Sequence, residues 1–356
     1  MQGIFGTSKG AATLLFLWIL AQCASFAGLA RAEESVKPPS IDQLLAGAHR
    51  FADGLVLNAA QLESHDPPIA GKKKLAELLD LYLLLLKRET SEAGRAAIFC
   101  RLDSLTLQVR TPAYQNLPRC SAAELDANAL SYLRVYVLLD RIHRLTPEDK
   151  EQIGRVKALL DESLARRGPW QREMFAEYYR RLGLALPAVL RDSTDPPDED
   201  GPANGSSADS LSSSRDATVV SQRIPFAQYN LQRAYALTHE VFAAFDYGER
   251  EQQQRFDEED LRYLKSVLIP LQQLTVRKQS LDLLAEVLSC RAYLGFNEDP
   301  SYRQALGLIL TSQNANGSWG DYEAHREVYG DTLEVEGYLH TTLVCVQALV
   351  DVSRRN

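Results

Sequence analysis

The sequence lacks most of the short motifs that identify common enzyme classes. It contains no nucleophile elbow, no P-loop, no dinucleotide-binding fingerprint and no H-E-x-x-H motif. Strand signals are nearly absent as well, because alternating apolar and polar residues do not recur along the chain. The predicted fold class is therefore all-α, built from stacked helical hairpins.

Basic charge is also scarce. The chain has 39 Lys and Arg residues against 47 Asp and Glu residues, a formal net charge of -8. This balance gives no electrostatic reason for the protein to bind nucleic acid or an anionic membrane surface. We therefore predict no nucleic-acid partner.

Only one stretch is long and apolar enough to resemble a membrane segment, and it lies at the N-terminus. Lys9 precedes the apolar residues 11–27, and Ala30-Arg31-Ala32 then forms a small-x-small cleavage site before Glu33. This order is typical of a secretory signal peptide over residues 1–32. We predict export to the periplasm or the cell exterior, with no stable membrane span after cleavage; an uncleaved anchor is the alternative.

Cysteine is sparse, and four of the five residues lie beyond the predicted signal: Cys100, Cys120, Cys290 and Cys345. Export permits disulfides, and the pairs that stay within each half of the chain are Cys100 with Cys120 and Cys290 with Cys345. The last two cysteines sit in apolar helical sequence. Buried free thiols are the alternative there.

Helical periodicity predicts an N-terminal helical region over residues 33–191. Its expected helices begin near Ile41 and then cover residues 72–88, 92–107, 122–142 and 147–166. Residues 75–86 are apolar on nearly every side, which predicts a central helix packed on several faces.

Residues 192–218 are acidic and rich in Ser, Pro and Gly, so we predict a disordered linker. A C-terminal helical region follows over residues 219–356. Its expected helices cover residues 226–245, 258–274, 280–294, 301–311 and 337–350. Between the last two, we expect a loop at a cavity mouth that carries Asp321, Tyr322, His325 and Asp331.

Two motifs in residues 313–345 resemble a known family. Gln313, Gly317 and Trp319 fit a Q-x-x-x-G-x-W pattern, and Gly337 to Cys345 carries His340 near the start of an apolar helix. Both segments resemble the repeats of terpenoid cyclases and protein prenyltransferases. The resemblance implies an α/α toroid, in which inner helices surround a central cavity and outer helices cover them.

The same motifs allow a structural interpretation. Gly317 would supply a turn, Trp319 would pack, and Gln313 would cap a neighbouring helix, while Asp321 and Tyr338 belong to the same cavity or structural motif. The D-x-D-D and D-D-x-x-D motifs are absent, so terpenoid cyclisation is not predicted. The N-terminal helices either complete the toroid, which we favour, or form a separate domain.

A set of possible metal ligands lies in the C-terminal half: His239, Asp282, Glu286, Cys290 and His340. The resemblance places His340 at the position of the prenyltransferase zinc-binding histidine. Two imidazoles, a thiolate and a carboxylate could hold zinc tetrahedrally. Alternatively, the histidines are hydrogen-bonded buried residues and the cysteine is a small hydrophobic residue.

A metal-free alternative uses His239 and His340 with Glu240, Asp246 or Glu286 as general acid and base. Two functions remain open on the sequence. The first is an exported helical binding or scaffold module whose cavity or groove holds a protein partner or an apolar small molecule. The second is a zinc-dependent enzyme of α/α-toroid type with a His/Cys/carboxylate site.

Overall fold

Helices provide the regular structure throughout the part of the chain that is described. The computed structural model describes residues 39–57, 71–112, 114, 121–187, 218–249 and 256–353, with an isolated bridge between Gln313 and Trp319 as the only β pairing among them. The predicted all-α class is confirmed. These residues belong to one compact unit, Pro39–Asn356. The predicted signal peptide and, apart from Thr218, the predicted linker lie outside the described residues.

The described helices fall before and after the predicted linker. Before it lie α2 (Ile41–Gly54), α4 (Gly71–Arg88), α5 (Glu92–Val109), α6 (Ala122–Arg141), α7 (Pro147–Ala165) and α8 (Pro169–Leu182). After it lie α10 (Val219–Gln222), η4 (Phe226–Gln228), α11 (Leu231–Phe245), α12 (Glu258–Lys278), α13 (Leu281–Tyr293), α14 (Pro300–Thr311), α15 (Tyr322–Tyr329), η5 (Gly330–Thr332), η6 (Val335–Tyr338) and α16 (Leu339–Ser353). None of these helices has the length and apolar character needed to cross a membrane.

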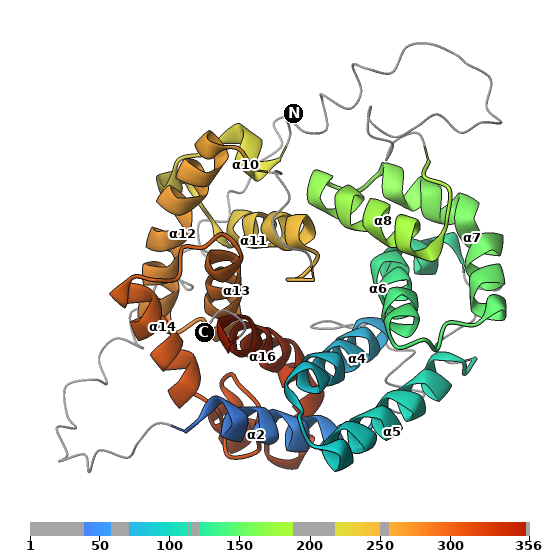
Figure 1. The fold of residues 1–356 in the computed structure, drawn as a ribbon, viewed down its shortest axis with the longest axis horizontal. Coiled ribbons are helices and arrows are strands. Elements are labelled where there is room, and N and C mark those ends of the chain that lie inside the picture. The colour runs from blue at the N-terminus through green and yellow to red at the C-terminus, as the bar shows by residue number, and fades with distance from the viewer. Residues whose placement is uncertain are drawn as a thin grey trace, which may run out of the picture. The chain divides into compact units, whose positions relative to one another are not determined.

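Six helices pack one against the next in a closed circuit. Helix α4 contacts α6, α6 contacts α8, α8 contacts α11, α11 contacts α13, α13 contacts α16, and α16 returns to α4 (Figure 1). A second set of helices packs against the outside of this circuit: α2, α5, α7, α12 and α14 (Figure 1). Inner and outer helices therefore alternate along much of the chain, as expected for stacked hairpins.

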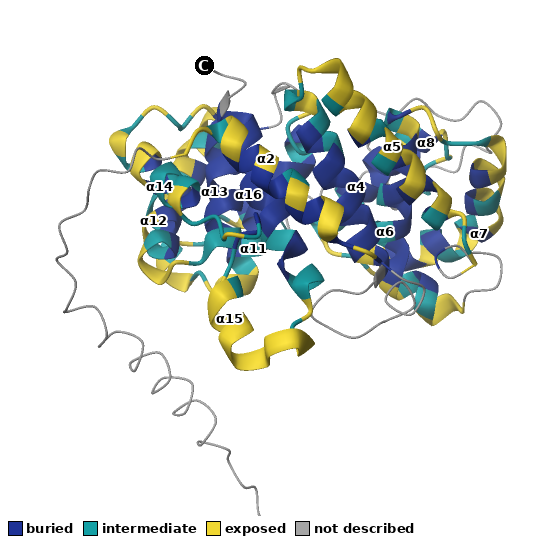
Figure 2. Ribbon diagram, turned by 90° about the horizontal axis from the view of Figure 1, so that it is seen from below, coloured by how far each residue is buried: buried dark blue, intermediate teal, exposed yellow. Residues whose placement is uncertain are grey.

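Apolar burial joins the two halves of the chain. One hydrophobic cluster extends from Leu44 in α2 to Val352 in α16, and Figure 2 shows the buried residues along the inner helices. A second cluster holds α10, α11, α12 and α13 together. Since burial of apolar area is the main favourable term in folding, the two helical regions stabilise each other.

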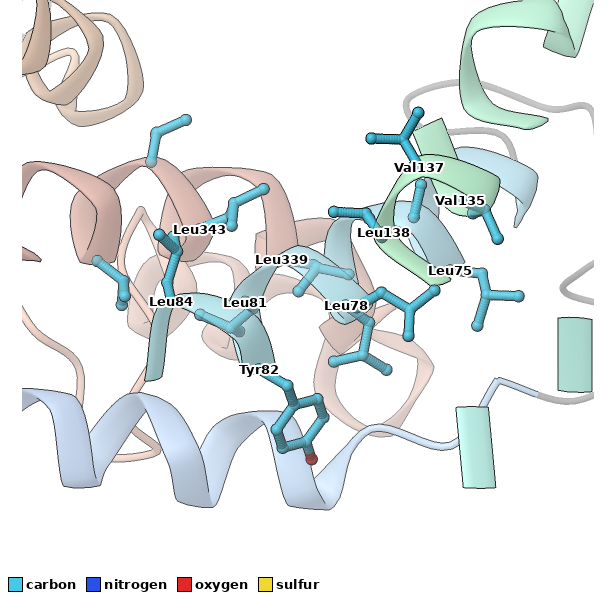
Figure 3. Packing of buried hydrophobic residues seen from close by; sticks show 14 of the residues in the cluster. Leu75, Leu78, Leu81, Tyr82, Leu84, Val135, Val137, Leu138, Leu339 and Leu343 are labelled. Carbon is cyan, nitrogen blue, oxygen red and sulfur yellow. The ribbon is translucent and has the colours of Figure 1, made fainter. Parts of the chain in front are cut away.

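Helix α4 is the centre of the first cluster. Leu75, Leu78 and Leu81 are almost completely buried, and they pack near Leu138 of α6 and Leu339 of α16 (Figure 3). The helix contacts α2, α5, α6 and α16. The predicted central helix, packed on several faces, is confirmed.

Local capping signals set several helix starts. At α7, Thr146 and Asp149 form a complete capping box. At α6, Ser121 accepts a hydrogen bond from the backbone of Glu124, but the reciprocal bond is absent, so only half of a capping box forms. Pro169, in the first turn, starts α8, for which no range was predicted.

Two predicted helix starts and one predicted loop were wrong. Helix α11 begins at Leu231, because Asn230 caps it and residues 226–228 form a separate 3-10 turn. The last helix begins at Leu339, after the 3-10 turn η6. The expected loop at Tyr322 is the exposed helix α15, which is anchored by tertiary contacts of its aromatic residues with Tyr338.

The Q-x-x-x-G-x-W segment attaches the turn after α14 to α2. Gln313 Nε2 donates hydrogen bonds to the carbonyl oxygens of Leu44, 2.8 Å away and 269 residues earlier, and of Gly317, 3.0 Å away. Gly317 has a φ of 89°, and a Cβ atom there would lie 2.0 Å from the carbonyl oxygen of Gly47. Only glycine fits this close backbone approach.

Trp319 fixes the other side of this turn. Its ring is fully buried, its Nε1 donates to the carbonyl of Ile309 at 2.8 Å, and its backbone N donates to Thr342 of α16 at 3.2 Å. Asp321 is exposed, and Tyr338 is buried against α15, with its hydroxyl 2.5 Å from Nδ1 of His325. These residues connect α14, α15 and α16 to one another.

Candidate functional site

A cavity of about 200 Å³ lies within the circuit of six helices, and we call it the chamber. Every helix of the circuit contributes side chains to it. The lining residues are Lys73, Ala76, Glu77, Asp80, Leu130, Ser131, Arg134, Trp170, Met174, His239, Phe242, Tyr247, Glu286, His340, Leu343, Val344 and Gln347. Because they come from distant parts of the chain, the chamber exists only in the folded circuit.

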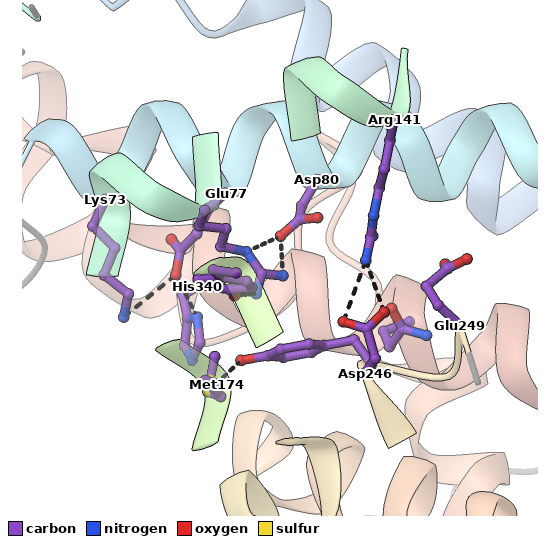
Figure 4. Close-up of polar contacts among 12 residues, drawn as sticks. Lys73, Glu77, Asp80, Arg141, Met174, Asp246, Glu249 and His340 are labelled. Carbon is purple, nitrogen blue, oxygen red and sulfur yellow. Dashed lines mark hydrogen bonds and ion pairs between the residues drawn. The ribbon is translucent and has the colours of Figure 1, made fainter. Parts of the chain in front are cut away.

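His340 is the second residue of α16 and faces α4. Its Nδ1 lies 2.8 Å from Oε1 of Glu77, and the Nζ of Lys73 lies 3.3 Å from the same oxygen (Figure 4). Burial works against the charged imidazole, but the neighbouring Glu77 carboxylate outweighs it and raises the pKa of His340. Burial likewise opposes ionisation of Glu77, yet His340 and Lys73 lower the pKa of this carboxyl. The pair therefore favours imidazolium and carboxylate.

Glu286 of α13 is the second carboxyl group at this end of the chamber. Thr238 donates a hydrogen bond to its Oε2 at 2.6 Å. Its Oε1 lies 3.8 Å from Nε2 of His340 and 3.9 Å from Nε2 of His239. Burial raises the pKa of Glu286 to about 7, against the opposing effects of Thr238 and His340. This carboxyl can therefore exchange a proton near neutral pH.

His239 of α11 completes this group. Its ring stacks on the indole of Trp170, with centroids 4.7 Å apart, and Phe242 meets it edge-on. Burial, with the nearby His340, lowers the pKa of His239 to about 3. The ring is therefore neutral over the physiological pH range.

Arg134 of α6 forms another part of the chamber wall. It donates to Asp80 of α4 at 2.5 Å and to the hydroxyl of Tyr178 at 3.0 Å, and its guanidinium lies 4.2 Å from the ring centre of Tyr247. The Tyr247 hydroxyl in turn contacts the sulfur of Met174 at 3.6 Å. Charge on this wall is thus paired and held in place.

The structure separates the predicted zinc ligands. Cys290 is fully buried in the second cluster, its sulfur faces the carbonyl oxygen of Thr238 at 3.6 Å, and burial raises the pKa of its thiol. Asp282 accepts hydrogen bonds from Tyr235 and Ser280. Neither residue lines the chamber. Within the described ranges, no group of three or more His, Cys, Asp or Glu side chains has an arrangement that could hold a metal ion.

The predicted zinc site on His239, Cys290 and His340 with Asp282 or Glu286 therefore has no support in the arrangement of the described residues. Cys290 follows Glu286 by one turn of α13, but its sulfur lies against the backbone of α11 and does not line the chamber.

Two of the carboxyl groups predicted for acid-base chemistry also lie outside the chamber. Glu240 accepts hydrogen bonds from the backbone N–H groups of Val219 and Val220, at 3.0 and 3.3 Å, and so caps α10; burial raises its pKa to about 7. Asp246 pairs with Arg141 at 3.1 Å and with Arg181 (Figure 4). Of the predicted set, only His239, Glu286 and His340 come together.

Sequence reasoning missed the α4 side of the chamber. Lys73, Glu77 and Asp80 lie four and three residues apart, which places them on one face of an otherwise apolar helix. This polar stripe was the available signal. The motif residues Gln313, Gly317, Trp319, Asp321 and Tyr338 do not line the chamber.

The cysteine pairing is settled for three positions. Cys290 and Cys345 are both buried free thiols, so the disulfide that export would permit between them does not form, and the alternative of buried thiols is confirmed. Cys100 is also free and exposed. Cys120 lies outside the described residues.

Residues 41–350 match the model of a protein family described as a domain of unknown function, DUF6895. The chain belongs to this family. The DUF6895 match begins at the first residue of α2 and ends within α16, so it includes all helices of the circuit and the whole chamber. No curated protein and no solved structure matches the chain.

Proposed function

We propose that this DUF6895 protein is an exported helical binding module whose chamber holds a small, mainly apolar molecule. The observation that carries the proposal is the chamber itself, a cavity of about 200 Å³ to which every helix of the circuit contributes. Binding sites for small molecules are concave and mostly apolar, with a few convergent polar groups. We also propose that the circuit is an α/α toroid, since inner and outer helices alternate as the resemblance implies.

The lining side chains and the volume of the chamber limit which ligands fit. Trp170, Met174, Phe242, Leu343 and Val344 offer aromatic and aliphatic surface. Apolar cavities of about 150 Å³ bind benzene. A chamber of about 200 Å³ thus suits one ring with a short substituent.

Toluene binding tests this proposal. Trp170 lines the chamber, so saturable quenching or enhancement of its fluorescence should report occupancy. The protein should also gain about 2.7 kcal/mol of stability when toluene is present at about 100 times its Kd. Ser131→Phe, which fills the chamber, should abolish both effects, whereas Ser266→Phe on the exposed surface of α12 should preserve them. Equal responses of the two variants would contradict the proposal.

One observation favours a second candidate, an enzyme that uses acid-base catalysis without a metal. Glu286, whose pKa burial raises to about 7, lies 3.8 Å from His340, so a proton donor and a proton acceptor face the same part of the chamber. Turnover of a bound molecule should then depend on both side chains. Mass spectrometry of an extract incubated with wild type or with Glu286→Gln tests this candidate, and identical product patterns would contradict it.

A further inference from the structure

Two ring nitrogens lie near the same carboxylate oxygen of the chamber. Nε2 of His340 and Nε2 of His239 lie 3.8 and 3.9 Å from Oε1 of Glu286. These separations are too long for direct hydrogen bonds, but each leaves room for one atom within hydrogen-bond distance of Oε1 and of the facing ring nitrogen. The geometry therefore provides a polar position beside Glu286 in the chamber.

The groups at this position offer a guest both a hydrogen-bond donor and a hydrogen-bond acceptor. Nδ1 of His340 is taken by Glu77, so Nε2 is the ring nitrogen that remains, and in the imidazolium it is a donor. Oε2 of Glu286 is taken by Thr238, which leaves Oε1. Because this carboxyl changes protonation near neutral pH, Oε1 either accepts or donates.

The charges around the chamber favour a neutral guest. Carboxyl groups and cationic side chains line it in equal number: Glu77, Asp80 and Glu286 against Lys73, Arg134 and His340. At the polar position an ammonium would face the imidazolium of His340, and a carboxylate would face the ionised form of Glu286. A hydroxyl carries one donor and two acceptor lone pairs, and it suits donor and acceptor neighbours together.

Competition with water also favours a guest that carries a polar group. A guest that displaces water from the polar position must replace the hydrogen bonds of that water, or binding loses affinity. A purely apolar guest would leave His340 and Glu286 without a partner at that point. Buried polar groups without partners are costly.

We propose that the ligand of the chamber is a small alcohol whose hydroxyl oxygen sits among His239, Glu286 and His340, while its apolar body packs against Trp170 and Met174. This inference rests on the proposed binding function. It adds the chemical class of the ligand, which the volume of the chamber alone does not give.

A matched pair of probes tests the class. Benzyl alcohol and ethylbenzene have the same shape and differ by a hydroxyl in place of a methyl group. Ethylbenzene partitions more readily into any apolar site, so the informative quantity is the ratio of the two Kd values, measured by calorimetry in wild type and in variants. Glu286→Leu should shift this ratio toward ethylbenzene by about tenfold.

A second variant and a control complete the design. His239→Phe preserves an aromatic ring against Trp170 and should shift the ratio in the same direction. Ser266→Phe, on the exposed surface of α12, should leave the ratio unchanged. If both probes bind wild type but neither polar variant shifts the ratio, the alcohol assignment is wrong and the binding function stands. If neither probe binds wild type, both proposals fall.

Discussion

At the scale of single residues, burial decides which groups of the chamber carry charge. Glu286 and His239 are both withdrawn from water, and the pKa of each moves toward its neutral form, to about 7 and about 3. The pKa of His340 is instead raised, toward the charged form, because the Glu77 carboxylate contacts the ring directly. One small cavity therefore holds one imidazolium, one neutral imidazole and one carboxyl that titrates near neutrality.

The Glu286 carboxyl should make stability depend on pH. Its pKa is about 7 in the folded chain, against an ordinary value of 4.5, so the folded state binds the proton more tightly than the unfolded state. The stability that this group contributes is complete below pH 4.5 and is lost as the pH rises through 7. Relative to Glu286→Gln, the free energy of unfolding of wild type should fall by up to about 3 kcal/mol over this interval. Urea unfolding at the two ends of the interval measures the difference.

The comparison with Glu286→Gln removes the contributions of groups that the substitution does not affect. Glu240 changes stability in the same direction, and His239 in the opposite direction at lower pH, but both are present in each protein. The difference includes the coupling between Glu286 and His340, because each alters the pKa of the other. Glu323→Gln, on the exposed helix α15, should show no pH-dependent difference from wild type. A constant difference between wild type and Glu286→Gln would show that the carboxyl is not perturbed.

Two glycines should respond oppositely to alanine. Gly317→Ala places a methyl group 2.0 Å from the carbonyl oxygen of Gly47, at a φ of 89°, and should destabilise the protein by about 3 kcal/mol or more. Gly154 lies within α7, where a Cβ atom meets nothing within 4 Å, so Gly154→Ala should stabilise the protein by up to about 1 kcal/mol. Thermal unfolding of both variants measures the contrast, and equal shifts would refute it.

At the scale of elements, one buried carboxylate connects three helices. Asp246 ends α11 in the left-handed region, with a φ of 47°, and it accepts hydrogen bonds from Arg141 at the end of α6 and from Arg181 at the end of α8. The next residue, Tyr247, lines the chamber. The ion pairs thus fix the backbone that positions part of the binding site.

Asp246→Asn should therefore cost far more stability than a matched surface change. The carboxylate is 3% exposed, and its neutralisation removes the counter-ion that Arg141 shares with Arg181, although Arg181 keeps Glu177 at 2.8 Å, so we expect a loss of about 3 kcal/mol. The control is Asp103→Asn, because Asp103 pairs with Arg144 on the surface at 2.7 Å and such pairs contribute less than about 1 kcal/mol. Urea unfolding compares the variants. Similar losses in both would mean that Asp246 does not connect these helices.

At the scale of the whole molecule, the circuit closes through contacts between the ends of the described chain. Helix α16 packs on α2 and α4, and Gln313 reaches Leu44 across 269 residues. One hydrophobic cluster extends from α2 to α16. No helix of the circuit is therefore packed independently of the others.

This closure predicts a single cooperative unfolding transition. Trp170 lies in α8 and Trp319 lies in the turn after α14, so the two indoles report from different halves of the chain. Urea curves recorded by fluorescence and by far-UV circular dichroism should coincide for wild type and for Trp170→Phe. Two separated transitions would instead indicate that the halves on either side of residues 192–218 unfold as independent domains.

The sequence by itself determined the fold class, the centre of the core and most helix starts. Thr146 with Asp149 and the apolar run of α4 are local signals, and local signals act through the 3.6-residue period and the caps of one helix. The sequence also identified His239, Glu286 and His340 as candidate site residues. The same signals missed α15, whose aromatic residues are held by the tertiary contact with Tyr338.

Only the tertiary structure decided which side chains meet. Glu77 and His340 are 263 residues apart, and their pairing depends on the crossing of α4 and α16. Cys290 does not line the chamber, because one turn beyond Glu286 its sulfur packs against the backbone of α11. A periodic pattern tells which face of a helix is buried, but it does not tell which other helix covers that face. The site of this protein is therefore a property of the closed circuit.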